Sequence, residues 1–219
     1  MTNLFSIFDP SNSMNLSMNW MSTILIFMLT PMKLWLIPSR LNSSWLIMFN
    51  KLSKTLNSLM KNSNQIKLFI VSIFTLIMLN NLMSLMPFIF PSSSHPAFSL
   101  SMSMPLWLSI MIYSMFKNPI KSLAHLVPND SPILISPFLV LIEMISNMIR
   151  PITLSIRLST NITAGHLIME LLGNAENKMM IMKSALMIQL TITILELMMA
   201  FIQTYVFSIL VSLYLKETY

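Results

Sequence analysis

The chain has 219 residues, of which 55% are hydrophobic and only 9% are charged, whereas an ordinary water-soluble domain carries about 25% charged residues. So few charges do not cover a globule of this size, and several stretches reach the ~18 apolar residues that indicate a bilayer span, which excludes a soluble protein. The net charge of +6 comes without a basic patch interleaved with aromatic residues, so nucleic acid is not an expected partner.

The amino-terminal end precedes the first predicted span. Residues 1–10 have neither a basic n-region nor an Arg-rich amphipathic pattern, so neither a signal peptide nor a transit peptide is expected. The chain is therefore expected to be made beside its own membrane, in a bacterium or inside an organelle. The apolar run over residues 20–37 predicts the first transmembrane helix.

A segment of mixed character follows. Over residues 44–61, apolar side chains recur at three- and four-residue steps, and Lys51, Lys54 and Lys61 lie off that stripe. This pattern predicts an amphipathic helix that lies on the membrane surface. A helix packed as in a soluble domain is the alternative.

Two further apolar runs, 68–90 and 98–116, are separated by a short polar turn at 91–96 and predict a transmembrane hairpin. The region 40–67 is basic and contains no acidic residue, as expected for a loop retained on the side of synthesis. The lysine-containing loop 117–130 should lie on the same side, because two crossings separate the two loops.

The C-terminal part consists of two long apolar runs, 133–173 and 179–215, joined by a polar link. Forty helical residues extend about 60 Å, roughly twice the hydrocarbon thickness. Either each run is one strongly tilted helix, or the first folds back at Arg150-Pro151; proline often kinks a membrane helix without ending it, so both remain open. The chain is thus predicted to be an all-α, polytopic membrane protein that forms a single membrane domain over residues 1–219.

Ionisable residues within these two runs are the strongest functional signal. An ionised group at mid-bilayer costs roughly 2.5–3.5 kcal/mol to insert, so a dispensable one is not expected there. The C-terminal runs nonetheless contain Glu143, Arg150, Arg157, His166, Glu170 and Glu196.

The spacing of the polar residues predicts one polar stripe on each helix. A step of seven residues separates Glu143, Arg150 and Arg157, and Asn161 follows one helical turn later. The second run repeats the step of seven with Gln189, Glu196 and Gln203. The two stripes are expected to face each other or a water-filled crevice, while the remaining surface meets lipid.

Each of these residues also has a structural interpretation. Arg157 lies well inside its run, which favours a functional role over an arginine that snorkels from a helix end. Arg150 adjoins Pro151, so a turn at the interface explains it as well as a functional role does. Glu143 fits equally well a structural ion pair with Arg150 or a functional role. His166 and Glu170 lie one turn apart, as either a proton relay or a simple hydrogen-bonded pair.

Other chemistries find no support in the sequence. There is no Walker A loop, Rossmann fingerprint or nucleophile elbow, and only two glycines and no cysteine are present. Three scattered histidines give no metal-ligand spacing, and His95 and His125 lie in predicted loops where they are expected to be solvated. No cofactor is expected, and the available chemistry is proton transfer by carboxylates and an imidazole near a fixed positive charge.

Residues 156–167, Ile-Arg-Leu-Ser-Thr-Asn-Ile-Thr-Ala-Gly-His-Leu, closely resemble the hallmark segment of subunit a of the mitochondrial F-type (rotary) ATP synthases. Three stretches of the second run are similar to that subunit's last helix: 194–196, 201–207 and 211–215. Residues 3–11 resemble the start of the arthropod versions. The resemblance covers nearly the whole chain, with high specificity in the C-terminal third and a looser match between residues 41 and 130.

The resemblance implies roles for particular residues. Arg157 matches the essential arginine that faces the rotating ring of c subunits and prevents a short circuit between two half-channels, and Asn161 and Gln203 match its polar neighbours. It also implies that both long runs are steeply tilted helices against the ring, with a bend at Arg150-Pro151. No role is implied for Arg150 itself.

Two half-channels follow from the same resemblance. His166 and Glu196 match the pair that lines the inlet half-channel from the intermembrane space, and Glu143 matches the acid of the outlet path to the matrix, whereas Glu170 matches no residue with a known role. The resemblance therefore implies a non-catalytic, proton-conducting stator subunit in the inner mitochondrial membrane. Its implied partners are the c-subunit ring, other membrane-sector subunits and the peripheral stalk.

Two other functions account for part of the pattern. A proton-coupled transporter or channel would use the same buried acids, but such proteins usually have paired repeats with broken helices, and no repeat is visible. A purely structural subunit of a respiratory complex would leave the intramembrane charges unexplained.

Overall fold

The computed structural model describes residues 5–11, 16–30, 37–59, 64–86, 88–117, 119–124, 126–127, 132, 135–175 and 182–218. Within these ranges the chain forms helices and connecting segments, with no strand. Four of the helices are long and apolar enough to cross a membrane, which confirms the predicted all-α, polytopic membrane fold. His125 lies outside the described residues.

The N-terminal part contains short elements. Two 3-10 turns, η1 (Ser6–Phe8) and η2 (Met18–Met21), precede helix α1, which spans Ser22–Leu29. The predicted span over residues 20–37 is therefore described only over its first part, because residues 31–36 lie outside the described ranges.

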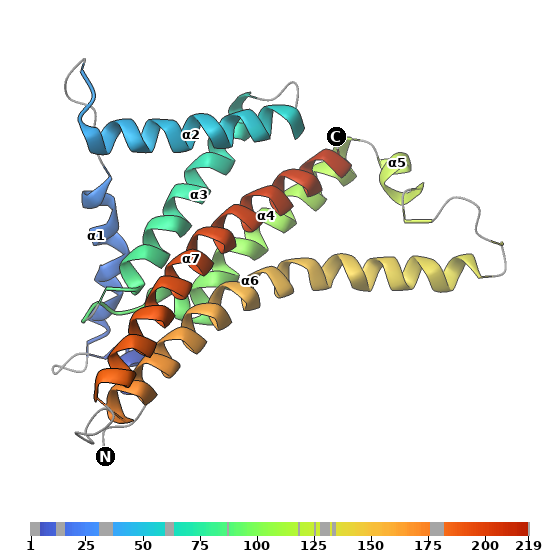
Figure 1. Cartoon of the computed structure of the whole chain (residues 1–219). Helices are drawn as coiled ribbons and strands as arrows, with labels where there is room; N and C mark the ends of the chain where they lie inside the picture. Colours follow the sequence, from blue (N-terminus) through green and yellow to red (C-terminus); the bar gives the residue numbers. More distant parts are fainter. Residues whose placement is uncertain are drawn as a thin grey trace.

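Helix α2 (Arg40–Leu59) crosses one end of the molecule and lies across the ends of α1 and α3 (Figure 1). Its apolar face packs inward, where Leu52 and Leu56 join the buried core. Lys51 and Lys54 are exposed. An apolar face toward the core and a lysine face toward solvent is the arrangement expected of an interfacial helix; Lys61 lies outside the described residues.

Helices α3 (Asn64–Ser84) and α4 (Pro96–Lys117) run in opposite directions and are joined through the 3-10 turn η3 (Ser92–Ser94). They do not form a closely packed pair: α3 packs chiefly on α7, and α4 packs chiefly on α6. The short helix α5 (Pro119–Ala124) follows α4 and lies at the same end of the molecule as α2 (Figure 1).

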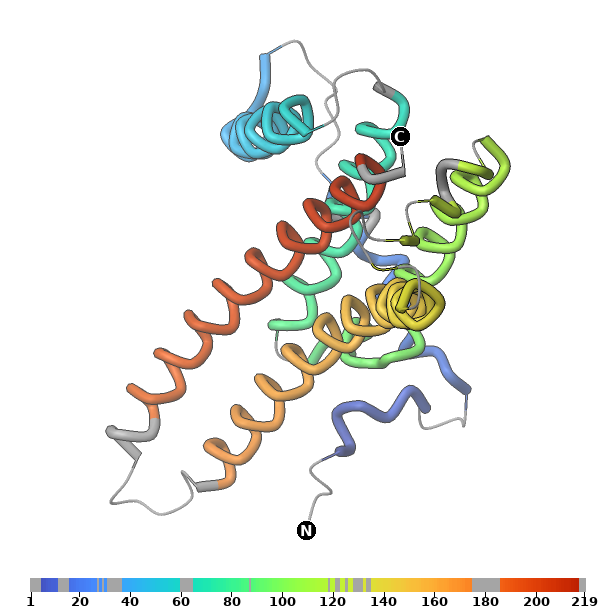
Figure 2. The backbone as a smooth tube through the Cα atoms, turned by 90° about the vertical axis from the view of Figure 1, so that its right-hand side faces the viewer, coloured from blue at the N-terminus to red at the C-terminus, as the bar shows by residue number. Residues whose placement is uncertain are grey.

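The two longest helices are α6 (Ser136–Ala175) and α7 (Met182–Thr218), which pack on each other. Helix α6 is continuous through Arg150-Pro151, so the alternative in which this run folds back is wrong. It bends, however: the part before residue 150 points away from the molecule, and the part after it runs beside α7 (Figures 1 and 2). Pro151 has no N–H for the helical ladder and its ring clashes with the preceding turn, which explains a kink here.

Small hydroxyl side chains line the helix contacts. Buried serines occur at the α4, α6 and α7 interfaces: Ser99, Ser103, Ser155, Ser159, Ser208 and Ser212. In a bilayer, helices gain little from the hydrophobic effect on association, so small residues that allow close approach stabilise the contact instead. Five of these hydroxyls donate to a carbonyl of their own helix; Ser103 is the exception and has no hydrogen-bond partner.

Candidate functional site

One hydrogen bond joins the polar stripes of α6 and α7. Asn161 Nδ2 donates to Gln203 Oε1 at 2.9 Å, and Gln203 is almost fully buried, with 7% exposure. A side-chain amide buried inside a membrane protein is costly without such a partner, because lipid offers none. The bond brings together two of the residues singled out in the sequence.

Glu196 on α7 contacts α6 at Gly165, one helical turn beyond Asn161. Its carboxyl group lies directly against the Cα of Gly165, so that a Cβ on residue 165 would come within 2.6 Å of Glu196 Oε1 and 2.7 Å of its Cδ. Real Cβ atoms do not approach other atoms so closely, and the absence of a side chain at Gly165 therefore gives Glu196 its present position. Glu196 Oε1 is buried and has no hydrogen-bond partner.

These residues surround a cavity between α6 and α7. Its volume is about 290 Å³, and its polar lining consists of Asn161, Glu196 and Gln203, while Gly165, Leu85 and Met199 contribute to its wall. One water occupies about 30 Å³ in the liquid, so the cavity has room for several. Polar atoms without protein partners in a cavity of this size form a suitable site for ordered water.

His166 follows Gly165 but points to a different side of α6. Its ring lies against the backbone of Ser84 at the end of α3, and its centroid is 6.3 Å from that of Phe8, edge-on. The Nε2 atom of His166 is buried and has no hydrogen-bond partner. His166 and Glu196 are thus neighbours through adjacent residues of α6, but they make no direct hydrogen bond.

Arg157 lies on the exposed surface of α6, unlike the buried groups of Glu196 and His166. Its side chain is exposed and makes no ion pair or hydrogen bond with any described residue. On the same helix, exposed Ile156 adjoins it in sequence, and Thr153 and Thr160, which are also exposed, lie about one turn to either side. A cation at membrane depth is expected to have an acidic or polar partner, and none of the described residues forms an ion pair with Arg157.

Glu143 and Arg150 form a loose pair on the first part of α6. Arg150 Nη2 is 3.9 Å from Glu143 Oε1, and the two side chains are 33% and 38% exposed. The Arg150 guanidinium also lies 5.2 Å from the ring centroid of Tyr214 on α7. The structural pairing considered for Arg150 is therefore present.

Along α6, the two carboxyl groups flank Arg157. Glu143 lies fourteen residues before Arg157, and the Glu196 contact at Gly165 lies eight residues after it. At 1.5 Å per residue these separations are about 21 Å and 12 Å along the axis of a straight helix. Neither carboxyl group is thus in direct contact with the arginine.

The sequence did not indicate two features of this region. His95 is not solvated as expected: its Nε2 donates to the Phe8 carbonyl at 2.9 Å, and its ring lies 5.4 Å from Trp20 and 5.2 Å from Phe90. Asn81 is completely buried, and neither its Nδ2 nor its Oδ1 has a partner. An asparagine within an apolar run is the signal that would have identified it.

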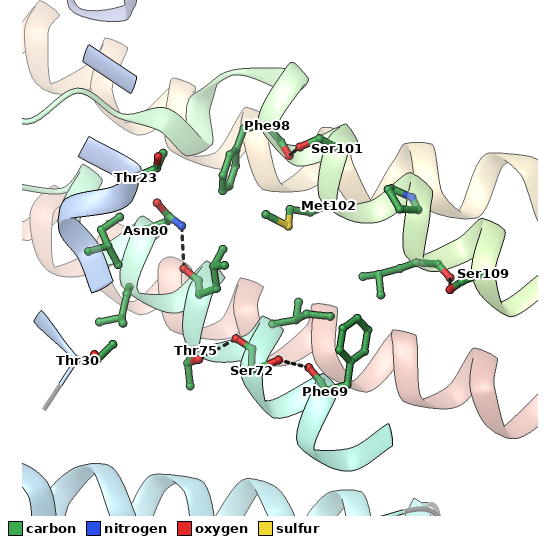
Figure 3. A pocket seen from close by; sticks show the side chains of 16 residues that line it. Thr23, Thr30, Phe69, Ser72, Thr75, Asn80, Phe98, Ser101, Met102 and Ser109 are labelled. Atoms are coloured by element: carbon green, nitrogen blue, oxygen red, sulfur yellow. Dashed lines mark hydrogen bonds between the residues drawn. The ribbon is translucent and has the colours of Figure 1, made fainter. Parts of the chain in front are cut away.

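A second cavity has different chemistry. It has a volume of about 690 Å³, lies between α1, α3 and α4, and touches none of the six predicted site residues (Figure 3). Hydroxyl groups of its lining on α3 and α4 donate to carbonyls of their own helix, as Ser72 does to Phe69 and Ser109 to Leu106. It contains neither a carboxyl group nor an imidazole and offers no route for proton transfer. Among the described residues, no cluster of three or more His, Cys, Asp or Glu is placed to hold a metal ion.

The fold and the site together have the features of a membrane protein that translocates ions: long apolar helices, buried carboxyl and imidazole groups, and an exposed arginine without an ion pair among the described residues. The family model described as the ATP synthase A chain matches residues 14–216. The chain belongs to this family.

Curated relatives agree over nearly the whole length. ATP synthase subunit a of Drosophila melanogaster is 44% identical over 221 residues, which cover 99% of both chains. ATP synthase F(0) complex subunit a of Rhopalosiphum padi is 47% identical with the same coverage, and subunit a of Anopheles gambiae is 44% identical over 223 residues. The chain is thus a proton-translocating, non-catalytic subunit of the membrane sector of an ATP synthase, and the transporter alternative is not favoured.

Proposed function

We propose that Arg157 separates two proton half-channels, an inlet that contains His166 and Glu196 and an outlet that contains Glu143. The observation that carries this proposal is the position of Arg157: it is exposed on α6 and has no ion pair among the described residues, with one carboxyl site on each side of it along the helix. The proposed partner is the ring of c subunits, whose membrane carboxyl groups would meet Arg157 in turn.

In this mechanism the proton enters through the cavity between α6 and α7. It passes His166 and Glu196 and neutralises a ring carboxylate, which can then rotate into lipid because a neutral acid is far cheaper to bury than a charged one. After nearly a full turn the ring carboxyl group releases the proton toward Glu143. The ionised group then passes Arg157 before it takes up the next proton.

The proposed role of Arg157 follows from its positive charge. An adjacent positive charge favours the ionised form of a carboxyl group, so the guanidinium drives release of the proton and does not carry one. The contact must remain weak, because a tight, desolvated ion pair would hold the ring in place. Each charge that crosses gains about 2.3 kcal/mol per 100 mV, so several protons are needed for each ATP made elsewhere in the complex.

The orientation follows from the charge distribution. The basic helix α2 lies at the opposite end of the molecule from the C-terminal ends of α3 and α6 (Figure 1). His166 contacts Ser84, the last residue of α3, and Glu196 contacts the adjacent Gly165, so both lie away from α2. Positively charged segments are retained on the side of synthesis, which for a chain made inside a mitochondrion is the matrix. We therefore propose the inner mitochondrial membrane as the location, with the inlet open to the intermembrane space.

The test is Arg157→Ala in the assembled ATP synthase, reconstituted in liposomes with an imposed proton gradient. ATP synthesis is expected to be lost, because protons would then pass from inlet to outlet without turning the ring. Arg150→Ala, on the same stripe but paired within the chain, is the matched control and is expected to retain most synthesis. Normal coupling in Arg157→Ala would overturn the proposal.

A further inference from the structure

Glu170 is an intramembrane carboxyl group for which the mechanism above has no task. It lies on α6 four residues beyond His166 and is partly buried. Its Oε2 atom is buried and has no hydrogen-bond partner, and no ion pair to it occurs in the described ranges. An enclosed carboxyl oxygen without a partner is unfavourable by about 1–3 kcal/mol or more, so a structural role does not account for this arrangement.

The spacing brings Glu170 close to His166. Residues four apart on a helix lie on the same face, with Cβ atoms about 5–6 Å apart. His166 Nε2 is likewise buried without a partner. The two proton-binding atoms make no direct hydrogen bond, and one water between them would provide each with the partner that the protein does not supply.

Their shared face points into the protein. At 100° per residue, His166 and Glu170 lie on roughly the opposite side of α6 from Arg157. The contacts of His166 with Ser84 and Phe8 show that this side faces α3 and η1. A proton on Glu170 is therefore kept apart from the exposed surface that carries Arg157.

Glu170 lies close to the C-terminal end of α6. The apolar span of α6 ends at Asn174, four residues or about 6 Å beyond Glu170. Glu170 therefore lies between His166 and the aqueous phase at this end of the molecule. Other buried polar groups without partners come from neighbouring elements: Asn81, Ser93 and Ser103.

We propose that Glu170 is a third proton-exchanging residue, which extends the inlet path from His166 to the membrane surface. Glu170 Oε2 accepts a proton from water at the end of α6 and passes it through an intervening water to His166 Nε2. The carboxylate is thereby regenerated, so each cycle moves one proton and leaves Glu170 unchanged. This inference rests on the inlet role proposed for His166 and Glu196.

Two substitutions at residue 170 separate proton exchange from shape. Glu170→Gln keeps the size and the hydrogen-bonding capacity but cannot exchange protons, whereas Glu170→His changes the shape and retains exchange. Proton uptake is measured in liposomes that contain the assembled complex, under an imposed membrane potential. A positioned proton-transfer group contributes about 10²–10⁴-fold, and water replaces part of a group near the surface, so Glu170→Gln is expected to lower uptake about fivefold to tenfold. Glu170→His is expected to retain at least half of it.

The controls are on the same two helices. Gly173→Ala adds a methyl group near the end of α6, where no atom lies within 4 Å of the added Cβ, and is expected to leave uptake unchanged. Glu196→Gln tests the inlet itself and is expected to abolish uptake. The amount of assembled complex is measured for every variant, and rates are expressed per complex.

The outcomes are distinguishable. Unchanged uptake in Glu170→Gln, with loss in Glu170→His, would show that the shape of residue 170 matters and would overturn this inference. Equal loss in both variants together with poor assembly would overturn it as well. Unchanged uptake in Glu196→Gln would instead refute the proposed inlet path, whatever the result at Glu170.

Discussion

The two parts of the bent helix α6 place their charged residues in different surroundings. Beyond the bend, near the end of α3 and the start of α7, buried polar atoms lack partners: those of Asn81, Ser93, Ser103, His166, Glu170 and Glu196. Before the bend, Glu143 and Arg150 pair loosely at 3.9 Å, about one third exposed. The first region encloses proton-binding groups, and the second leaves them open.

This difference has an energetic meaning. Folded proteins leave few buried polar atoms unsatisfied, because each costs about 1–3 kcal/mol without a partner. A concentration of such atoms in one region indicates that water completes their hydrogen bonds. An exposed ion pair, in contrast, contributes about 0–1 kcal/mol and needs no enclosed site. Substitutions in the enclosed region should therefore have large effects on proton flow, whereas a substitution of Arg150, the cation of the open pair, should have a small one.

Gly165→Ala is expected to have the largest effect within this comparison. The added Cβ would lie 2.6 Å from Glu196 Oε1, which is the end of a flexible side chain. The carboxyl group would move aside with little effect on folding, but the proton-carrying atom would leave its place. Misplacement by about 1 Å can lower a rate 10²-fold, so proton-driven ATP synthesis is expected to fall by about 10–100-fold.

Two variants make this prediction specific. Gly173→Ala on the same helix meets no atom within 4 Å and should behave as the unaltered chain. Glu196→Asp in the Gly165→Ala background shortens the acid by one methylene and should recover part of the activity that Gly165→Ala loses. Equal loss of ATP synthesis from both glycine substitutions would contradict the prediction that the position of the Glu196 carboxyl group is what Gly165→Ala disturbs.

The Asn161–Gln203 bond lines the same cavity as Glu196 but carries no proton in the proposed mechanism, so its loss should have an intermediate effect. Asn161→Leu leaves buried Gln203 without its 2.9 Å partner and is expected to destabilise the complex by about 1–3 kcal/mol. Asn161→Leu combined with Gln203→Leu removes both groups and should cost less than the sum of the single changes. Thermal unfolding of the detergent-solubilised complex measures these costs, and simple additivity would mean that the bond contributes nothing.

Much of this architecture was predictable because a bilayer permits few alternatives. Long apolar runs become helices, since lipid satisfies no backbone group, and intramembrane charges mark functional sites. The spacing of four residues after Arg157 placed Asn161, and the step of seven placed Gln203, on stripes expected to face each other or a crevice, and the two side chains form a hydrogen bond. The continuity of α6 through Pro151 could not be derived from the residues alone, because proline is compatible with both a kink and a turn in a membrane.

The enclosed region was harder to predict because its contacts join distant parts of the chain. His95 meets Phe8 and Trp20, which precede it by more than seventy residues, and no periodicity links them. Asn81 is a single polar residue in an apolar run, which produces no stripe. The contact between Gly165 and Glu196 depends on how α6 and α7 are aligned, and neither sequence stretch determines that alignment.

Arg150 in the open region should be the position least sensitive to substitution, and Arg150→Gln tests this expectation. The change removes the 3.9 Å contact with Glu143 and the guanidinium above Tyr214. An exposed pair and an exposed cation–π contact each contribute about 1 kcal/mol or less, so thermal stability of the solubilised complex should change by at most about 1–2 kcal/mol. ATP synthesis should decrease by less than in Gly165→Ala.

The control is Tyr214→Leu, which removes only the aromatic ring and should lower thermal stability by no more than Arg150→Gln does. A loss of synthesis in Arg150→Gln as complete as that expected for Arg157→Ala would mean that the outlet is also an enclosed site, and the distinction between the two parts of α6 would not hold.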